Sequence, residues 1–362
     1  MNNIYYCKIY KDRSGLCNQL FSLITGIIIA YKTGKKTIIV DDFLNDYSKK
    51  ETSLFSQLFD IDKLNTFLKE NYDIYIFDKN KIHFQVQEVK YGIHNQTIDI
   101  TNEIIDNYCS NNSLFIDTNV NLNVLVKVDP APNMLKKLYI KYLINNILFE
   151  EEYDEKYCFL TNQIMFDLSK AIFQYEFGWI KTHYQPIFEN ILNHLYVTPY
   201  ISEHVDRFIQ TNHIDTTKKI NVIHLRLEED AINHWSKMNN MTPIMFHTFL
   251  SVKYIQIIKK YIDKSDQNII LSYSTDNHVV SYLKKNNYKC YFTDKTNIGR
   301  EINALIDLNI GKICNNLFIG NFNMEQLNGS TLSFCLINHF NKKVKLALID
   351  LDNVRQCEKI YF

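Results

Sequence analysis

The second half of the sequence alternates short apolar runs with segments of helical periodicity, and this alternation constrains the fold more than any other feature. The first apolar run is INVIHL, which begins at Ile220, and a segment of helical spacing follows at residues 246–262. Later strands are expected in QNIILSYS, YKCYFT, NLFIGN and KVKLALID, and later helices in NHVVSYLKKN and at residues 300–314 and 331–340. Regular alternation of this kind is typical of βαβ units around a parallel sheet. We therefore predict an α/β fold for this half.

The first half of the sequence has a less regular pattern, although it also opens with a strand, a helix and a strand. A tract rich in Tyr and Asn follows, with short strand candidates in DIYIF and SLFID. Helices are expected near residues 133–148 and 184–195. Strand character is lost at residues 198–217, and the 362 residues of the chain suffice for two cores. We predict an N-terminal lobe of residues 1–205 and a C-terminal lobe of residues 206–362, with a cleft between them.

Composition and charge argue against several classes of function. Lys and Arg together number 40, as do Asp and Glu, so the basic surface of a nucleic-acid-binding protein is not expected. The eight cysteines are scattered without a C-x-x-C pair, which indicates free thiols in a reducing compartment. The apolar run at residues 20–31 is too short to span a bilayer, and the polar N-terminal residues do not form a signal peptide. We expect a cytoplasmic protein with no membrane span.

The run INVIHL leads directly into the charged segment HLRLEED, which is the first candidate for a binding site. Along a strand, His224 and Arg226 point to one face of the sheet, and the leucines beside the arginine point to the other. Ligands of open α/β sheets bind at the carboxyl ends of the strands, where an arginine offers a planar fork to a phosphate or carboxylate. Asp230, four residues further on, can hold the arginine or approach a sugar hydroxyl. The alternative is a surface cluster of salt bridges.

Two expected helix N-termini add to this site. In SGLCNQLF, Gly15 ends the first strand and a helix is expected to start near Asn18, where backbone N–H groups can reach an anion. In NGSTLSF, Ser330 and Thr331 open a helix in the same way, and a preceding helix carries Asp307. Capping without a ligand is the alternative at both places. The sequence has no G-x-G-x-x-G or Walker A pattern, so the features together indicate a cleft for a nucleotide diphosphate of another kind.

Four segments, in chain order, carry a resemblance to a known family: GLCNQLF, HLRLEED, YSTD, and IDLNIGKICNNLFIGN with the following STLSF. They resemble the GDP-fucose-dependent fucosyltransferase superfamily, in particular protein O-fucosyltransferases and their plant relatives. The matched order covers nearly the whole chain, although residues 46–174 match nothing in the family. The resemblance implies a GT-B-like fold, with two Rossmann-type lobes facing across a cleft. It places the acceptor on the side of the N-terminal lobe and the nucleotide sugar in the C-terminal lobe.

The resemblance also implies an inverting transfer of fucose from GDP-fucose to a protein or glycan hydroxyl, with no metal and no other cofactor. Arg226 would grip the β-phosphate and stabilise the departing GDP, and Asp230 matches the aspartate that follows this arginine in the family. His224 and Asp307 would contact the nucleotide. Hydrogen bonds to the donor are assigned to three hydroxyl groups, those of Ser330, Thr331 and Ser333.

The turn at Gly15 and the side chain of Asn18 would face the sugar and the acceptor. Cys17 stands where many family members have glycine, and the segment FNMEQLNG lengthens the loop before STLSF. We count Arg226, Asp230, Glu229 and Asn18 as catalytic candidates. The base that takes the acceptor proton remains open among Glu229, Glu228, Asp230 and His234.

Three other functions remain open. The pairs Asp350-x-Asp352 and Asp60-x-Asp62 could ligate Mn²⁺ or Mg²⁺ in a metal-dependent transferase, although we expect no metal site. The fold could instead persist as a non-catalytic module that binds a sugar nucleotide or a glycan. A transferase of the same fold could also use another donor, of the GDP-mannose or UDP-rhamnose type.

Overall fold

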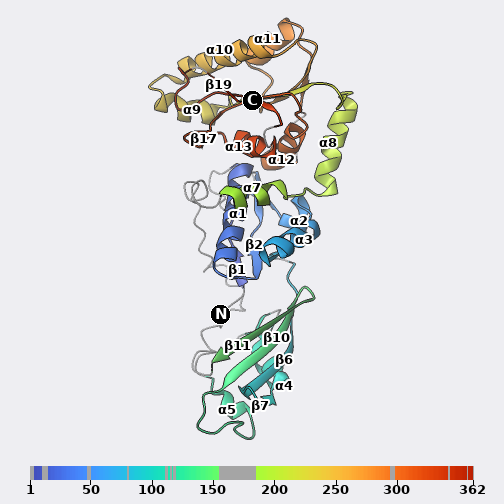
Figure 1. The fold of residues 1–362 in the computed structure, drawn as a ribbon, viewed down its shortest axis with the longest axis vertical. Helices are drawn as coiled ribbons and strands as arrows, with labels where there is room; N and C mark the ends of the chain where they lie inside the picture. The colour runs from blue at the N-terminus through green and yellow to red at the C-terminus, as the bar shows by residue number, and fades with distance from the viewer. Residues whose placement is uncertain are drawn as a thin grey trace.

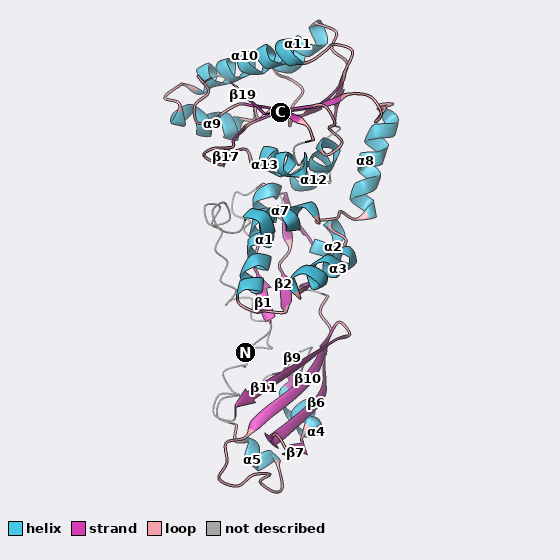
Figure 2. Cartoon of the chain, in the orientation of Figure 1, coloured by secondary structure: helices cyan, strands magenta, loops and turns pink. Residues whose placement is uncertain are grey.

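The computed structural model describes residues 4–9, 15–46, 50–79, 81–110, 113–114, 116, 120–154, 185–293, 298–340, 343–356 and 358–361. They form three units along the long axis of the molecule: a C-terminal α/β lobe, a smaller N-terminal α/β unit next to it, and an antiparallel sheet at the far end (Figure 1). Figure 2 shows the same view with helices and strands distinguished. The predicted α/β fold with two α/β lobes is confirmed, and the antiparallel sheet is an addition that we did not predict.

The C-terminal lobe is built on a six-stranded sheet in the order β14-β13-β12-β15-β18-β19. Its strands are β12 (Ile220–His224), β13 (Gln267–Leu271), β14 (Cys290–Phe292), β15 (Leu317–Gly320), β18 (Lys345–Leu348) and β19 (Lys359–Tyr361). All neighbours pair in parallel except β19, which runs antiparallel to β18. The strands β12, β13 and β15 are buried at every residue, because helices cover both faces of the sheet. The five strands expected in this half are confirmed.

Helices form a layer on each side of this sheet (Figure 1). One layer contains α9 (Glu229–Met238), α10 (Pro243–Tyr261) and α11 (His278–Lys285), and the other contains α12 (Arg300–Gly311) and α13 (Thr331–Phe340). Consecutive residues of β12 point to opposite faces, so Ile223 packs with the first layer and Val222 with the second. The helices expected in this half are confirmed. The two faces of β12 therefore belong to two different hydrophobic cores, one with each layer of helices.

The N-terminal unit contains a three-stranded parallel sheet in the order β1-β2-β5. Its main elements are β1 (Ile4–Cys7), β2 (Thr37–Val40), β5 (Tyr75–Asp78), α1 (Leu16–Lys32) and α3 (Ile61–Tyr72). Most side chains of α1 are buried, because this helix packs against the sheet and against the C-terminal lobe. Gly26 permits the close approach of α1 to β1, since a Cβ at this position would lie 2.4 Å from the Cys7 Sγ. The strand–helix–strand opening and the strand in DIYIF are confirmed.

A four-stranded antiparallel sheet in the order β11-β10-β6-β7 follows β5 and has a second hydrophobic core. Its elements are β6 (Phe84–Ile93), β7 (Gln96–Asp99), α4 (Thr101–Tyr108), α5 (Leu122–Leu125), β10 (Lys137–Ile144) and β11 (Ile147–Asp154). The helix expected at residues 133–148 is therefore wrong. Buried and half-buried residues alternate along β10, which is the period of a strand. Asn145 and Asn146 both have positive φ angles, 48° and 67°, which are typical of a tight hairpin turn.

The helix α7 (Gln185–Asn193) confirms the helix expected near residues 184–195. The next helix, α8 (Pro199–Thr211), connects the N-terminal half of the chain to the C-terminal lobe, and position 205, where we placed the boundary, lies inside it. The remaining described elements are short: β3 (Phe43–Asp46), β4 (Glu51–Ser53), α2 (Phe55–Leu58), β8 (Cys109–Ser110), β9 (Ser113–Leu114), β16 (Phe322–Asn323) and β17 (Asn328–Gly329).

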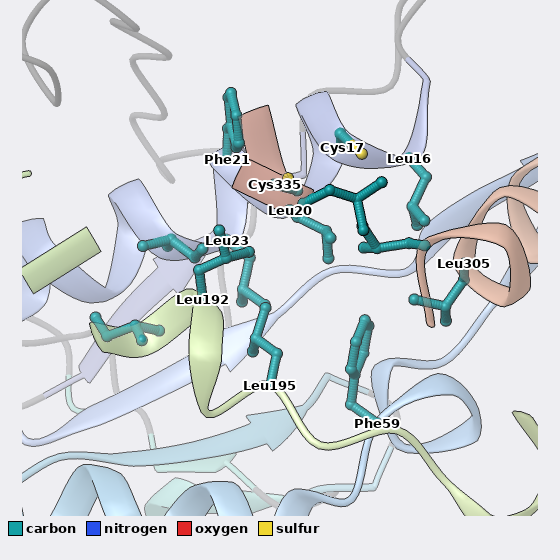
Figure 3. Close-up of a cluster of buried hydrophobic side chains, with 14 of the residues drawn as sticks. Leu16, Cys17, Leu20, Phe21, Leu23, Phe59, Leu192, Leu195, Leu305 and Cys335 are labelled. Carbon is teal, nitrogen blue, oxygen red and sulfur yellow. The ribbon is translucent and has the colours of Figure 1, made fainter. Parts of the chain in front are cut away.

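One continuous hydrophobic core joins the N-terminal unit to the C-terminal lobe. The ring centroid of Phe334 on α13 lies 5.6 Å from that of Phe21 on α1 and 5.9 Å from that of Phe188 on α7. Figure 3 shows part of this cluster, where side chains of α1, α7, α12 and α13 come together. The lobes are therefore held in a fixed relation by packed side chains and not only by the connecting chain.

None of the helices in the described residues is long and apolar enough to cross a bilayer. The described cysteines are free thiols, as expected: Cys7, Cys17, Cys109, Cys290, Cys314 and Cys335. Cys158 and Cys357 lie outside the described residues.

The last turn of α13 should make stability depend on pH. Burial, together with the positive charges of Lys312 and Lys343, lowers the pKa of His339 from its ordinary value of 6.5 to about 4. Between these two values the unfolded chain binds a proton at this position and the folded chain does not, so the free energy of unfolding should fall as the pH drops from 6.5 to 4. His339→Gln should weaken this dependence in thermal melts across that range. His94→Gln, at an exposed position, is the control. If the free energy of unfolding fell equally steeply with decreasing pH in both variants, His339 would not be the source of the dependence.

Candidate active site

A cavity of about 590 Å³ lies where the C-terminal ends of the central strands meet the first turn of α1. The strand β12 lies between β13 and β15, so the sheet order reverses there, which is the point where open α/β sheets bind ligands. The volume falls within the range of roughly 300–1,000 Å³ that is usual for small-molecule sites. The cavity is lined by Gly15, Leu16, Cys17, Asn18, His224, Arg226, Glu228, Trp235, Leu271, Ser272, Tyr273, Gly299, Arg300, Glu301, Asn303, Ala304, Asp307, Gly329, Ser330, Thr331 and Leu332.

The strand β12 brings His224 and Arg226 to this cavity. His224 is the last residue of the strand and is buried, whereas 22% of the Arg226 side chain is exposed. Leu225, between them, packs into the core on the side of α10. The alternation of a strand thus places both polar residues on the cavity wall, as the sequence predicted.

Two carboxylates hold the Arg226 guanidinium in place. Its Nη1 lies 2.9 Å from Glu228 Oε2, and its Nη2 lies 3.3 Å from Asp230 Oδ2. Burial would lower the pKa of Arg226, but the negative charges of Glu228 and Asp230 outweigh that effect and raise the pKa above its ordinary value. The guanidinium is therefore charged and already oriented, which reduces the entropy lost when an anion binds.

Among the acids that follow Arg226, Glu228 lines the cavity, and the structure brings neither Glu229 nor Asp230 onto its wall. Glu229 is exposed in the first turn of α9. Partial burial would raise the pKa of Asp230, but the charge of Arg226, with a contribution from Arg300, holds that pKa below its usual range. Asp230, whose side chain is 58% exposed, is thus a partner of Arg226 and a weak proton acceptor. The fourth candidate base, His234, is also exposed and does not line the cavity.

The helix α1 begins two residues earlier than expected, at Leu16, with Gly15 as its N-cap. Gly15 and Asn18 line the cavity, as predicted. The Leu16 N–H, however, donates to Glu301 Oε2 at 2.5 Å, and Glu301 is a buried residue of α12. The first N–H group of this helix therefore binds a carboxylate of the protein itself and is not available to a phosphate.

The N-terminus of α13 faces the cavity through Ser330 and Thr331, as predicted. The first N–H groups of a helix have no partner within the helix, so this end offers donors to an anion. The lengthened segment FNMEQLNG forms the small β16–β17 hairpin just before it. Asn323 Nδ2 donates to Asp350 Oδ2 at 2.6 Å, and Asn328 Nδ2 donates to Asp352, which anchors both strands of the hairpin.

Three of the four aspartates in the two Asp-x-Asp pairs have structural partners. Asp350 and Asp352 hold the hairpin, and Asp60 caps α3 by accepting from the Lys63 N–H at 3.1 Å. The described residues contain no group of three or more His, Cys, Asp or Glu side chains placed to hold a metal ion.

Several cavity residues were missed by the sequence reasoning, and Arg300 is the most important of them. It lies in the first turn of α12, with its Nη2 3.8 Å from Asp230 Oδ2 and 49% of its side chain exposed. Asp307 lies two turns further along the same helix, buried at the cavity wall, where the sequence had placed it. Trp235 and Tyr273 add aromatic surface to the wall. Arg300 gives the cavity a second cation beside Arg226.

Ser333 differs from the other residues that were predicted to contact the nucleotide sugar. It is fully buried and does not line the cavity. Its Oγ lies 2.8 Å from His224 Nδ1, so it can reach a ligand in the cavity only through the His224 ring. The assignment of a direct contact to Ser333 is corrected accordingly.

No protein-family model matches the chain, and no curated protein matches it. Solved structures that are similar to it include POFUT1 in complex with GDP-fucose, at 11% identity over 93% of each chain with a TM-score of 0.45. The NodZ α-1,6-fucosyltransferase soaked with GDP-fucose is 10% identical over 100% of this chain and 99% of that chain, with a TM-score of 0.48. The fucosyltransferase NodZ from Bradyrhizobium is 11% identical over 97% and 96%, with a TM-score of 0.46.

Proposed function

We propose that the chain is a glycosyltransferase that binds GDP-fucose in this cavity and transfers fucose to a hydroxyl group of a protein or glycan. The position of Arg226 carries the proposal, because its guanidinium is held by two carboxylates at the point where the sheet order reverses. The resemblance of four sequence segments to GDP-fucose-dependent fucosyltransferases supports the choice of donor. The partners are thus a nucleotide sugar and an acceptor, and a cytoplasmic location remains part of the proposal.

In the proposed reaction, the bond between the anomeric carbon and the β-phosphate oxygen breaks while the acceptor oxygen attacks from the opposite face. GDP leaves with the electron pair, and the configuration at the anomeric carbon is inverted. Arg226 and Arg300 neutralise the negative charge that develops on the β-phosphate, and the N–H groups at the start of α13 add hydrogen bonds. Two guanidinium groups supply the charge that a divalent cation would otherwise supply, so the proposal needs no metal.

Donor binding would also prepare a base. The Glu228 Oε2 lies 2.9 Å from Arg226 Nη1. When a diphosphate engages Arg226, Glu228 no longer has this guanidinium to itself, and its carboxylate is then placed to accept a hydrogen bond from an acceptor hydroxyl in the cavity. We therefore propose Glu228 as the group that takes the acceptor proton, in preference to Glu229 and Asp230, which do not line the cavity.

The remaining predicted residues of the cavity are assigned either to the nucleotide-sugar donor or to the acceptor substrate. His224 and Asp307 are proposed to contact the nucleotide, and the hydroxyl groups of Ser330 and Thr331 the phosphates. Asn18, with the Gly15 turn, borders the side toward the N-terminal unit, where the sugar and the acceptor would meet.

A non-catalytic binding module is the second candidate, and one observation favours it. The Glu301 carboxylate accepts a hydrogen bond from the first N–H of α1, where we had expected an anionic group of the nucleotide sugar. A chain that retains the cavity but lacks one of its expected anion donors could hold a sugar nucleotide without consuming it.

The experiment that tests the proposal is a thermal-shift series with GDP, GDP-fucose, GDP-mannose, UDP and UDP-sugars, with and without EDTA. A ligand at 100 times its Kd stabilises a protein by about 2.7 kcal/mol. We expect guanine nucleotides to raise the melting temperature equally in the presence and absence of EDTA. A response to UDP compounds alone would reject the donor, and a response lost in EDTA would reject metal independence. Binding of GDP-fucose without release of GDP, whatever acceptor is supplied, would favour the non-catalytic module.

A further inference from the structure

A buried network of hydrogen bonds joins the end of β12 to the end of β15 directly behind the cavity wall. Asn321, the first residue after β15, donates from Nδ2 to the His224 carbonyl oxygen at 3.0 Å. On the α10 side, the Tyr254 hydroxyl accepts from the Arg226 N–H at 3.1 Å, and its oxygen lies 2.7 Å from Asn321 Oδ1 and 2.8 Å from the His224 carbonyl oxygen, the two acceptors for its proton. Both Asn321 and Tyr254 are fully buried. The network fixes the backbone that carries the two polar residues of the cavity wall.

The α13 side of the sheet completes this network through Ser333. The Ser333 Oγ accepts from the Asn321 N–H at 3.0 Å and lies 2.8 Å from His224 Nδ1. Gly320 makes room for this hydroxyl, since a Cβ at position 320 would lie 2.9 Å from the Ser333 Oγ. The imidazole is therefore held at one nitrogen by a group that is itself held by the backbone of the neighbouring strand.

The position of the hydroxyl proton follows from what each atom can donate or accept. A serine hydroxyl has one proton to give, and the Ser333 Oγ already accepts from Asn321. Within the part of the chain that the structure describes, His224 Nδ1 is the one acceptor found for that proton. Nδ1 therefore accepts and carries no proton of its own. In a neutral imidazole, the proton must then reside on Nε2.

We infer that Ser333 and Asn321 fix His224 as the neutral tautomer protonated on Nε2, so that its ring offers a hydrogen-bond donor to a ligand oxygen. A neutral donor adds no further charge beside Arg226 and Arg300. Ser333 is a positioning residue that acts through His224. The identity of the ligand rests on the proposed function, whereas the tautomer follows from the contacts within the chain itself.

Long-range ¹H–¹⁵N correlation spectra of the chain labelled with ¹⁵N-histidine, recorded at pH 8, test this inference. The His224 signals are identified by their loss in His224→Asn. We expect a bare Nδ1, far downfield, and a protonated Nε2. Ser333→Ala should let the ring exchange between tautomers, so that both nitrogens move to intermediate shifts. Ser251→Ala is the control, because it removes another buried serine hydroxyl, for which the described residues offer no hydrogen-bond partner. This variant should leave the His224 signals unchanged. A protonated Nδ1 in the wild-type chain would overturn the inference without any need for a variant.

Titration with GDP separates this inference from the proposed function. Loss of one oriented donor in Ser333→Ala should weaken GDP binding by roughly tenfold, which corresponds to one hydrogen bond of about 1.4 kcal/mol. A wild-type chain with the expected tautomer and no affinity for GDP would reject the proposed function and leave the inference standing. If the chain bound GDP but both His224 ring nitrogens had intermediate chemical shifts, the inference would be rejected and the proposed function would stand.

Discussion

Replacing Arg226 with alanine should remove most of the affinity of the chain for GDP. The diphosphate would lose its oriented guanidinium, which should cost roughly 2–5 kcal/mol, or about 30-fold to several-thousand-fold in Kd. Isothermal titration calorimetry of GDP into the two proteins measures the difference. Arg226→Lys should fall between them, because lysine retains the charge but not the planar fork.

Two controls make this result specific. Arg207→Ala removes an exposed arginine on α8 and should leave the affinity unchanged. Arg226→Ala also deprives Glu228 of its cation, so the double variant Arg226→Ala/Glu228→Gln tests whether an uncompensated carboxylate, and not the lost contact, weakens binding. GDP affinity equal to that of the wild type in Arg226→Ala would remove Arg226 from the site.

Phe334→Ala should strongly destabilise the whole chain. The Phe334 ring is buried where the lobes meet, with Phe21, Phe188 and Phe322 around it at centroid distances of 5.6, 5.9 and 5.1 Å. Truncation of a buried phenylalanine typically costs about 3–5 kcal/mol, through lost burial and the cavity left behind. Because the core is continuous between the lobes, we expect a single unfolding transition with its midpoint at a lower urea concentration than in the wild type. Circular dichroism measured across a urea series detects this shift.

The matched control is Phe249→Ala on α10, a residue that is already 44% exposed. This variant should change the free energy of unfolding by no more than a small fraction of the effect at Phe334. If Phe334→Ala instead split the unfolding curve into two transitions with only one of them shifted, the lobes would be independent and the shared core would not govern their placement.

The C-terminal lobe could be predicted because its local signals agree with one another. Apolar runs such as that of β12 are short, fully buried and separated by segments of helical period, which few folds other than a parallel sheet accommodate. The position of Arg226 two residues beyond the end of β12 then determines where its side chain lies. Helix α13 was predicted at its observed bounds for the same reason.

The antiparallel sheet of the first half was only partly predictable. The turn at Asn145 and Asn146 is a recognisable hairpin signal, but the apolar residues of β10 were assigned to a helix at residues 133–148. Such short runs fit either period, and it is the pairing of β10 with β6, more than 40 residues earlier in the sequence, that selects the strand.

The residues of the cavity wall were harder to predict than the antiparallel sheet, because contacts between residues far apart in the sequence bring them together. Glu301 meets the Leu16 N–H across 285 residues of sequence, and Arg300 approaches Asp230 only because the fold brings the first turns of α12 and α9 together beside the cavity. No local pattern marks either residue as a site residue. Ser333 shows the opposite error, since its place in a motif suggested a direct contact, whereas the turn of α13 directs its hydroxyl to His224.

The measurement that tests the central claim most directly is a crystal structure of the chain with GDP. The account predicts the diphosphate in the cavity of about 590 Å³, with the β-phosphate within hydrogen-bond distance of the Arg226 guanidinium and close to the start of α13. GDP bound elsewhere on the molecule, or an empty cavity at a GDP concentration far above 1 mM, would contradict it.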